Sequence, residues 1–300
     1  MVGKGDNKGN LFGGDWTTHK LDVLAGYLSS YTTALKNAHF EKLYIDAFAG
    51  TGYRDARRKE PESILELPFP DLAEAETQRL LEGSARRALA AKPRFERYVF
   101  IERSPERCAQ LEALKSEFPS LAKDIEIRQG DANSEIRTLC SRDWRSRRAV
   151  LFLDPYGMQV EWATIEAVAR TQAIDLWVLF PLGMGVNRLL KKSGDIPEGW
   201  RRRLDLLLGT RDWHDEFYRV DVTPTLFGGD EERVVKASME TIGKYFNKRL
   251  ESVFVGVAPT PGVLRNSKQN PLYLLCFAVG NARGRDIALR IANHLLKEVS

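Results

Sequence analysis

The sequence predicts an α/β protein built on a doubly wound, mainly parallel sheet of seven strands, with helical insertions and an antiparallel final hairpin. Three observations predict this fold. Apolar runs alternate with helical segments over 97–182, which is the order of parallel βαβ units. Several runs are apolar throughout, as strands covered on both faces should be. Two further apolar runs near the carboxyl end are joined by a short connection, which suits a hairpin.

The elements follow one another in a regular order. Residues 1–15 are rich in Gly, Asn and Lys and are expected to be flexible. A helix is expected over 19–37, capped by Thr17 or Thr18, because apolar side chains recur on one face. The apolar run 43–50 is expected to be a buried strand that enters a glycine turn. Further strands are expected at 97–102, 125–131, 149–155, 175–182, 252–259 and 272–280, and further helices from 83, over 105–118, near 133–141, over 161–171, over 232–250 and at the carboxyl end.

Length and composition exclude several classes of protein. The 300 residues can bury a full core without disulfides or metals, and no proline-rich linker divides them. We therefore expect one domain over 16–300, with insertions near 53–82 and 183–230. The charge balance of 45 − 41 = +4 neither requires nor excludes a nucleic acid. No apolar run suits a membrane span or a secretory signal.

The cysteines and histidines give no sign of a metal site. The three cysteines are far apart and form no CxxC pair. This indicates a reduced, cytoplasmic protein. The four histidines show no HExxH or similar ligand spacing, so no metal is expected.

Glycines or carboxylates follow four successive strands of the predicted sheet. After the first strand comes D-A-F-A-G-T-G (46–52), where glycines let the backbone approach a ligand closely. The second strand ends in Glu102, which can accept two hydrogen bonds from ribose hydroxyls. The third ends in G-D-A-N (130–133), where Asp131 can accept from an adenine amino group. The fourth ends in D-P-Y-G (154–157). Chance is a poor explanation for glycines or carboxylates at the ends of four successive strands.

The glycine pattern narrows the choice of ligand. It is neither the GxGxxG of dinucleotide sites nor the GxxxxGK[ST] of a P-loop. A nucleoside-type cofactor without phosphates fits better, and we expect S-adenosylmethionine (SAM). Its amino-acid end would lie at the glycine turn, its ribose on Glu102 and its adenine near Asp131. The residues expected to bind it are Asp46, Phe48, Gly50, Gly52, Glu102, Asp131 and Ala132.

The motif series resembles the class I SAM-dependent methyltransferases and, more closely, the three-Cys-motif partner (TcmP) family. The resemblance covers nearly the whole chain and implies a Rossmann-like class I methyltransferase fold. It also implies a partner protein that carries a three-cysteine motif and is similar to radical-SAM proteins. The matching segments are W-T-x-x-K (16–20), Y-I-D-A-F-A-G-T-G (44–52), G-S (83–84), F-I-E (100–102), G-D-A-N (130–133), F-L-D-P-Y-G (152–157), Trp162, D-L-W-V-L-F-P (175–181) and L-Y-L-L-C-F-A (272–278).

The D-P-Y-G segment is similar to the (D/N/S)-P-P-(Y/F) motif of enzymes that methylate adenine N6 or cytosine N4. In those enzymes the acidic or amide side chain and a proline carbonyl accept hydrogen bonds from the exocyclic amine, and the aromatic ring stacks on the base. The resemblance implies that Asp154, Pro155 and Tyr156 carry the catalysis. The second proline is absent and Tyr156 comes one position early, so a simple tight turn stays open as the alternative.

Basic side chains gather in three groups. The groups within 54–59 and 188–203 follow strands, on the edge of the expected site, where they could attract phosphates. The group within 142–148 precedes a strand and is expected to be a solvated face. The aromatic residues near the last group could stack bases or pack in a helical cap on the sheet; they are Trp200, Trp213, Phe217, Tyr218 and Phe227.

Three further segments of the chain carry expectations of their own. Trp16 and Lys20 either cover the cofactor or belong to a capped surface helix. Phe180 and Pro181 could form the far wall of a substrate pocket. The loop at 265–266 is expected to be plain surface.

Two function hypotheses follow from these observations. The first is a cytoplasmic SAM-dependent methyltransferase acting on DNA, RNA or another nucleobase-containing substrate. The second is a SAM-binding or catalytically silent partner subunit that acts with a three-cysteine-motif protein. A nuclease ranks last, because the sequence shows no PD-(D/E)xK or HNH pattern.

Overall fold

The computed structural model describes residues 16–48, 83–155, 157–224 and 230–299. Their central sheet has eight strands in the order β3-β2-β1-β4-β5-β10-β8, with β9 also paired to β10. The strands from β3 to β5 in this order are parallel, and β10 runs antiparallel to β5, β8 and β9. The predicted fold class is confirmed. The expected count of seven strands is one short, because the edge opposite β3 is split between β8 and β9.

The elements have the following bounds. The sheet contains β1 (Glu41–Ala47), β2 (Arg97–Glu102), β3 (Ile125–Gln129), β4 (Arg147–Leu153), β5 (Ile174–Phe180), β8 (Gly256–Val257), β9 (Gly262–Arg265) and β10 (Pro271–Val279). The helices are α1 (Trp16–Ala34), the helical residues 83–90, α3 (Pro105–Glu117), α4 (Ala132–Cys140), α5 (Trp162–Arg170), α6 (Asn187–Leu189), α7 (Glu198–Leu208), α8 (Trp213–Phe217), α9 (Met239–Glu251) and α10 (Arg285–Leu296).

Two hydrophobic cores cover the two faces of the sheet. The first contains side chains of α4, α5, α7 and α9, and the second contains side chains of α1, residues 83–90, α3 and α10. Successive residues of a strand point to opposite faces, and β1 shows this alternation. Ile45 lies in the first core, whereas Tyr44 lies in the second. The sheet is therefore buried on both faces, as the continuous apolar runs predicted.

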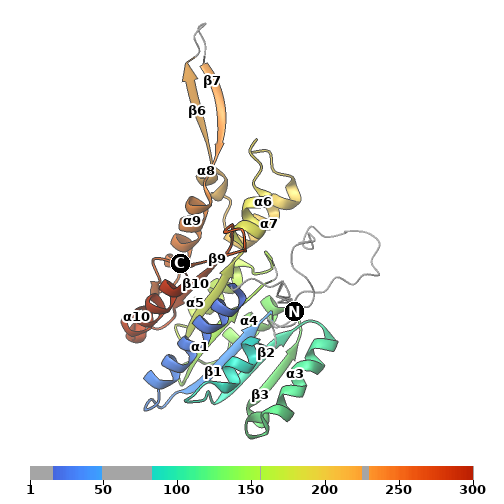
Figure 1. Ribbon diagram of the computed structural model, residues 1–300, viewed down its shortest axis with the longest axis vertical. Coiled ribbons are helices and arrows are strands. Elements are labelled where there is room, and N and C mark those ends of the chain that lie inside the picture. The colour runs from blue at the N-terminus through green and yellow to red at the C-terminus, as the bar shows by residue number, and fades with distance from the viewer. Residues whose placement is uncertain (1–15, 49–82, 156, 225–229, 300) are drawn as a thin grey trace, which may run out of the picture.

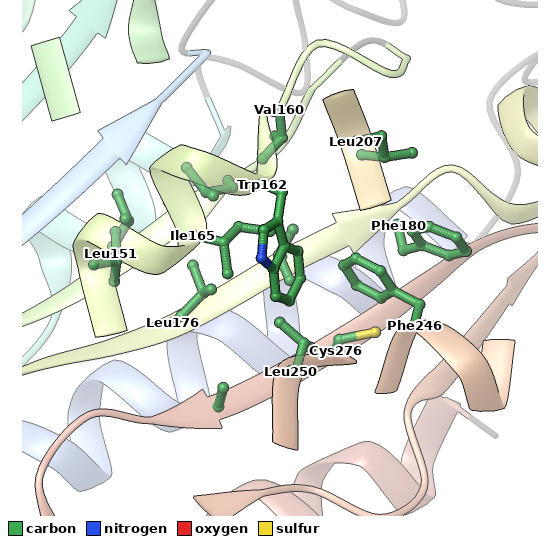
Figure 2. Close-up of a cluster of buried hydrophobic side chains, with 14 of the residues drawn as sticks. Leu151, Val160, Trp162, Ile165, Leu176, Phe180, Leu207, Phe246, Leu250 and Cys276 are labelled. Carbon is green, nitrogen blue, oxygen red and sulfur yellow. The ribbon is translucent and has the colours of Figure 1, made fainter. Parts of the chain in front are cut away.

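The first core closes around Trp162 at the start of α5 (Figure 2). Phe180 is fully buried there and stacks on Phe246, with ring centroids 4.1 Å apart and planes 14° apart. The Trp162 ring meets Phe246 edge-on at 6.4 Å. The Phe180 ring thus belongs to the core, where it cannot serve as the expected wall of a substrate pocket.

Residues 218–236 form a structure that the sequence analysis did not predict. The antiparallel strands β6 (Tyr218–Pro224) and β7 (Asp230–Lys236) make a separate ribbon that projects from the sheet (Figure 1). The helix expected over 232–250 starts only at Met239. Val234 pairs with Val220 across the ribbon, and β-branched residues favour strands. Ser238 then caps α9, since its hydroxyl oxygen accepts a hydrogen bond from the Thr241 amide at 3.1 Å.

Two other expected boundaries shift. Helix α1 begins at Trp16, so positions 17 and 18 lie within its first turn and not at the expected position before the helix. The strand expected over 252–259 is reduced to β8, because residues 252–255 form the turn and bend that follow α9. Within the described residues, no helix combines the length and the hydropathy that a membrane crossing requires.

Candidate functional site

Three of the expected site carboxylates lie at the carboxyl edge of the sheet. Asp46 pairs in register with Phe100 of β2 and with Phe152 of β4. Glu102 lies two positions after Phe100, and Asp154 lies two positions after Phe152. Because these strands are parallel, all three carboxylates gather at one edge, which is where doubly wound sheets bind ligands.

The end of β3 lies beside the end of β2. The Gly130 amide donates to the Glu102 carbonyl at 3.0 Å. Asp131 is exposed and caps α4, since its carboxylate accepts from the Ser134 amide at 2.9 Å. Ala132 is buried in the first core. The structure therefore brings Glu102 and Asp131 together, as the sequence analysis expected for the ribose and adenine ends of a nucleoside.

Glu102 is a buried carboxylate with one unsatisfied oxygen. Its side chain is only 2% exposed, and its Oε1 accepts from the Ser104 amide at 2.6 Å. Its Oε2 is buried and receives no hydrogen bond within the described chain. Burial raises the pKa of Glu102, an effect opposed by the Ser104 amide and the charge of Arg107. Glu102 is therefore a buried group and not a solvated residue at the end of a strand.

Asp154 forms an ion pair with a buried lysine from the first helix. Lys20 is 1% exposed, and its Nζ lies 2.5 Å from Oδ2 of Asp154. The ammonium also lies 5.4 Å from the ring centroid of Trp16 and 5.8 Å from that of Phe152. Aromatic faces at such distances attract a cation. The alternative of a capped surface helix is thus wrong for Lys20, which belongs to the carboxyl edge.

Asp46 lies in the same polar cluster. The Tyr44 hydroxyl donates to its Oδ2 at 3.0 Å, and Ser84 also donates a side-chain hydrogen bond to this carboxylate. Burial raises the pKa of Asp46 from 3.8 to about 7. The hydrogen bonds and the charge of Lys20 lower it, whereas the charge of Asp154 raises it. Asp46 therefore changes charge near neutral pH in the free protein.

We predict that Asp46→Asn stabilises the free protein above neutral pH. Between about pH 4 and pH 7 the folded Asp46 keeps a proton that the unfolded chain has lost. The unfolded state binds fewer protons there, so this group's contribution lowers stability as pH rises. Asn has no proton to lose, so ionisation of a buried carboxylate does not destabilise the variant. Its free energy of unfolding should exceed the wild-type value by about 2–4 kcal/mol above pH 7.

Urea unfolding at about pH 4 and about pH 8 measures this difference. The gain should be present at the higher pH and absent at the lower one. Asp175→Asn is the comparison variant. Burial also raises the pKa of Asp175, to about 6, and its carboxylate lies away from the carboxyl edge, where it accepts a hydrogen bond from the Tyr27 hydroxyl. A gain in Asp46→Asn that is equal at both pH values would contradict the assignment.

Asn133 connects the loop after β3 to the loop after β4. Its Nδ2 donates to the Gln159 carbonyl at 2.9 Å, and its Oδ1 accepts from the Glu161 amide at 3.0 Å and the Thr164 hydroxyl at 2.9 Å. These bonds hold the loop that contains D-P-Y-G close to the Asp131 loop. Asn133 belongs to the G-D-A-N motif (130–133), but no role was expected for it.

The turn after β1 begins at Phe48. This residue has a φ of 67°, in the left-handed region that non-glycine residues rarely occupy. Its side chain is buried in the first core, so its contribution to the site is the direction of the backbone. Gly50, Gly52 and Tyr156 lie outside the described residues, and so does the basic group within 54–59. Pro155 is buried directly after Asp154.

The other charged and aromatic groups divide between core and surface. Trp213 and Phe217 are fully buried in the first core, which supports the helical cap and excludes base stacking by these two rings. Arg203 is also buried, and desolvation lowers its pKa to about 10. Lys191, Lys192 and Arg202 are exposed beyond the carboxyl end of β5; Phe227 lies outside the described residues.

The remaining expectations concern the amino edge of β4 and the last hairpin. Arg147 pairs with Glu41 at 2.8 Å, and Arg145 pairs with Asp143 at 2.8 Å, at the edge opposite the site. Arg265 is exposed in the loop between β9 and β10. Arg142, Arg145 and Arg265 are exposed, as expected, whereas Arg147 and Arg148 are partly buried.

Two site residues, Tyr44 and Ser84, were missed as partners of Asp46. Tyr44 lies two positions before Asp46 on the same strand, so the period of two residues places both on one face. That signal was present in the sequence. Ser84 is separated from Asp46 by a long segment, and no local pattern could have joined them.

Comparisons with known proteins give likenesses of overall arrangement. No family model matches the sequence, and no curated protein gives a significant match. A DUF519 protein of Legionella pneumophila is 11% identical over 93% of this chain and 92% of its own, with a TM-score of 0.42. A SAM-dependent methyltransferase of Clostridium acetobutylicum is 13% identical over 87% and 92%, with a TM-score of 0.37. A methyltransferase of Geobacter sulfurreducens is 14% identical over 71% and 78%, with a TM-score of 0.27. The fold class itself is established by the strand order and pairing.

Proposed function

We propose that this protein is a SAM-dependent methyltransferase that methylates an amino nitrogen. The observation that carries the proposal is the Oε2 atom of Glu102, a buried oxygen without a donor in the described chain. Such an atom is costly unless a ligand satisfies it. A ribose at the end of β2 would supply two hydroxyl donors, as it does at the equivalent position of nucleotide-binding sheets.

The residues at this edge fit the parts of SAM. Glu102 would hold the ribose, Asp131 and Ala132 would lie at the adenine, and Asp46 and the turn from Phe48 would meet the amino-acid end. Asp46 has a pKa of about 7, so the positive charges of SAM would favour its ionised form. When bound, SAM supplies a methyl group already activated by its positive sulfur.

An amino group is the acceptor that the D-P-Y-G segment suits best. Asp154 is 23% exposed and lies at the same edge as Asp46 and Glu102. Its carboxylate can accept a hydrogen bond from an N–H group and so aim the nitrogen lone pair. Alignment of the acceptor is the main requirement when the methyl group is already activated.

A nucleic acid is the substrate class that we propose. The resemblance of D-P-Y-G to the motif of base methyltransferases favours it, and Lys191, Lys192 and Arg202 are exposed beyond β5, where phosphates could bind them. The test is a transfer assay with tritiated SAM against DNA, total RNA and tRNA. Label in one pool is the expected result. No label in any pool, with SAM binding intact, would overturn the proposed substrate class.

A second candidate is the partner subunit of a three-cysteine-motif protein, as the resemblance to the TcmP family implies. The ribbon of β6 and β7 favours it, because Val220 and Val222 are 57% and 54% exposed on this projection. Exposed apolar side chains grouped on a projection favour a protein contact. Copurification with the three-cysteine protein, lost in Val220→Lys with Val222→Lys, would support this role. Retained methyl transfer without the partner would contradict a silent subunit.

A further inference from the structure

Lys20 is the most deeply buried cation in the described chain, and the proposed chemistry gives it no role so far. A buried ammonium is unfavourable unless it is paired. Its partner here is Asp154, which lies 134 positions away in the sequence. The first turn of α1 is itself held in place, since Trp16 stacks on Tyr273 of β10 with centroids 5.6 Å apart. The position of the ammonium is therefore determined by the packing of α1 on the sheet.

The two partners differ in how far they reach the surface. The Lys20 side chain is 1% exposed, whereas that of Asp154 is 23% exposed. The ammonium thus holds Oδ2 from the buried side. A carboxylate has two oxygens and about four acceptor positions, so one ion pair leaves acceptor capacity for another donor.

We propose that Lys20 is a positioning residue of the methyl-transfer site, whose ammonium holds the Asp154 carboxylate in the orientation that accepts a hydrogen bond from the substrate amine. This inference rests on the proposed function. Lys20 acts through Asp154 and does not itself touch the amine. An acceptor held from behind keeps its direction as the amine arrives, which is how supporting residues orient reactive groups in other sites.

The same ammonium also acts on the cofactor end of the edge. The charge of Lys20 lowers the pKa of Asp46, and the charge of Asp154 raises it. Lys20 therefore lies within electrostatic range of both carboxylates. Its placement favours the negative form of Asp46, the carboxylate that would meet SAM.

The sequence offers a matched control in Lys42. This residue lies at the opposite end of β1 and is 7% exposed in its side chain, and its Nζ lies 2.7 Å from Oε1 of the half-exposed Glu96. Lys42→Met removes a buried lysine and its ion pair away from the site. Lys20→Met removes the corresponding pair within it, and Lys20→Arg keeps the positive charge.

The experiment measures methyl transfer from saturating tritiated SAM to whichever of DNA, total RNA or tRNA the wild type labels. It uses the full chain, at a pH well above the Asp46 pKa of about 7. We expect Lys20→Met to lower kcat about 100-fold, the scale of a small misplacement of a reacting group. The SAM Kd should stay within threefold of wild type, Lys20→Arg should recover part of the loss, and Lys42→Met should keep the wild-type kcat.

Crystal structures of wild type and Lys20→Met provide the second readout, which needs no acceptor. We expect the Asp154 carboxylate to leave its wild-type orientation in the variant. An unchanged orientation, or an unchanged kcat, would overturn the positioning role. If wild type labels no pool, the proposed substrate class fails on its own, and the orientation of Asp154 in Lys20→Met still decides whether Lys20 orients that carboxylate.

Discussion

Replacing Glu102 by alanine is expected to weaken SAM binding about 100-fold. Hydrogen bonds to a charged group contribute about 1.5–3 kcal/mol each, and the proposed site makes such bonds from two ribose hydroxyls to one carboxylate. We expect a loss of about 3 kcal/mol of binding free energy, which is about 100-fold in Kd because each 1.4 kcal/mol is tenfold in affinity. Isothermal titration of SAM into wild type and Glu102→Ala measures the two Kd values.

Glu112 provides the control for this substitution. It lies on α3 and its carboxylate is half exposed, paired with Lys115 at 2.7 Å. Glu112→Ala should leave the SAM Kd within twofold of wild type. Equal affinity of wild type and Glu102→Ala would exclude Glu102 from the cofactor site and remove the main support for the proposed function.

Replacing Asp154 by alanine is expected to lower the rate of methyl transfer about 1,000-fold while the SAM Kd changes less than threefold. A hydrogen bond to a charged group contributes about 1.5–3 kcal/mol, and a small misplacement of the reacting amine costs about 10²-fold more. The effect should fall on kcat, because Asp154 would meet the acceptor and not the cofactor. Single-turnover transfer from tritiated SAM, measured beside titration of SAM, separates the two effects.

Asp154→Ala leaves the buried Lys20 without its ion pair, which by itself can unfold a protein. The double variant Lys20→Met with Asp154→Ala removes both charges and should fold stably. It should be as inactive as the single variant. Recovery of transfer in the double variant would mean that Asp154 serves only to neutralise Lys20.

Much of the fold could be predicted from the sequence because its strands carry their own signal. Buried apolar residues run through the middle of β1, β2, β4 and β5, and burial on both faces of a parallel sheet requires that pattern. The carboxylates of Asp46, Glu102 and Asp154 end such runs, so parallel pairing alone places them at one edge. Local pattern was sufficient at these positions.

The pair of Lys20 and Asp154 could not be predicted, because it depends on how α1 docks on the sheet. A lysine on a helix is usually solvated, and only the packing of α1 on the sheet shows that Lys20 is buried. The ribbon was missed for another reason. Its strands mix valines with charged residues and bury little surface, so Val220 and Val234 carry no hydrophobic pattern strong enough to distinguish strand from helix.

The most direct test of the account is a crystal structure of the protein with SAM bound. We expect SAM at the carboxyl edge of the sheet, with the ribose hydroxyls within hydrogen-bond distance of Glu102 Oε2 and the sulfonium methyl directed toward Asp154. SAM bound elsewhere on the chain, or bound at this edge with its ribose away from Glu102, would contradict it.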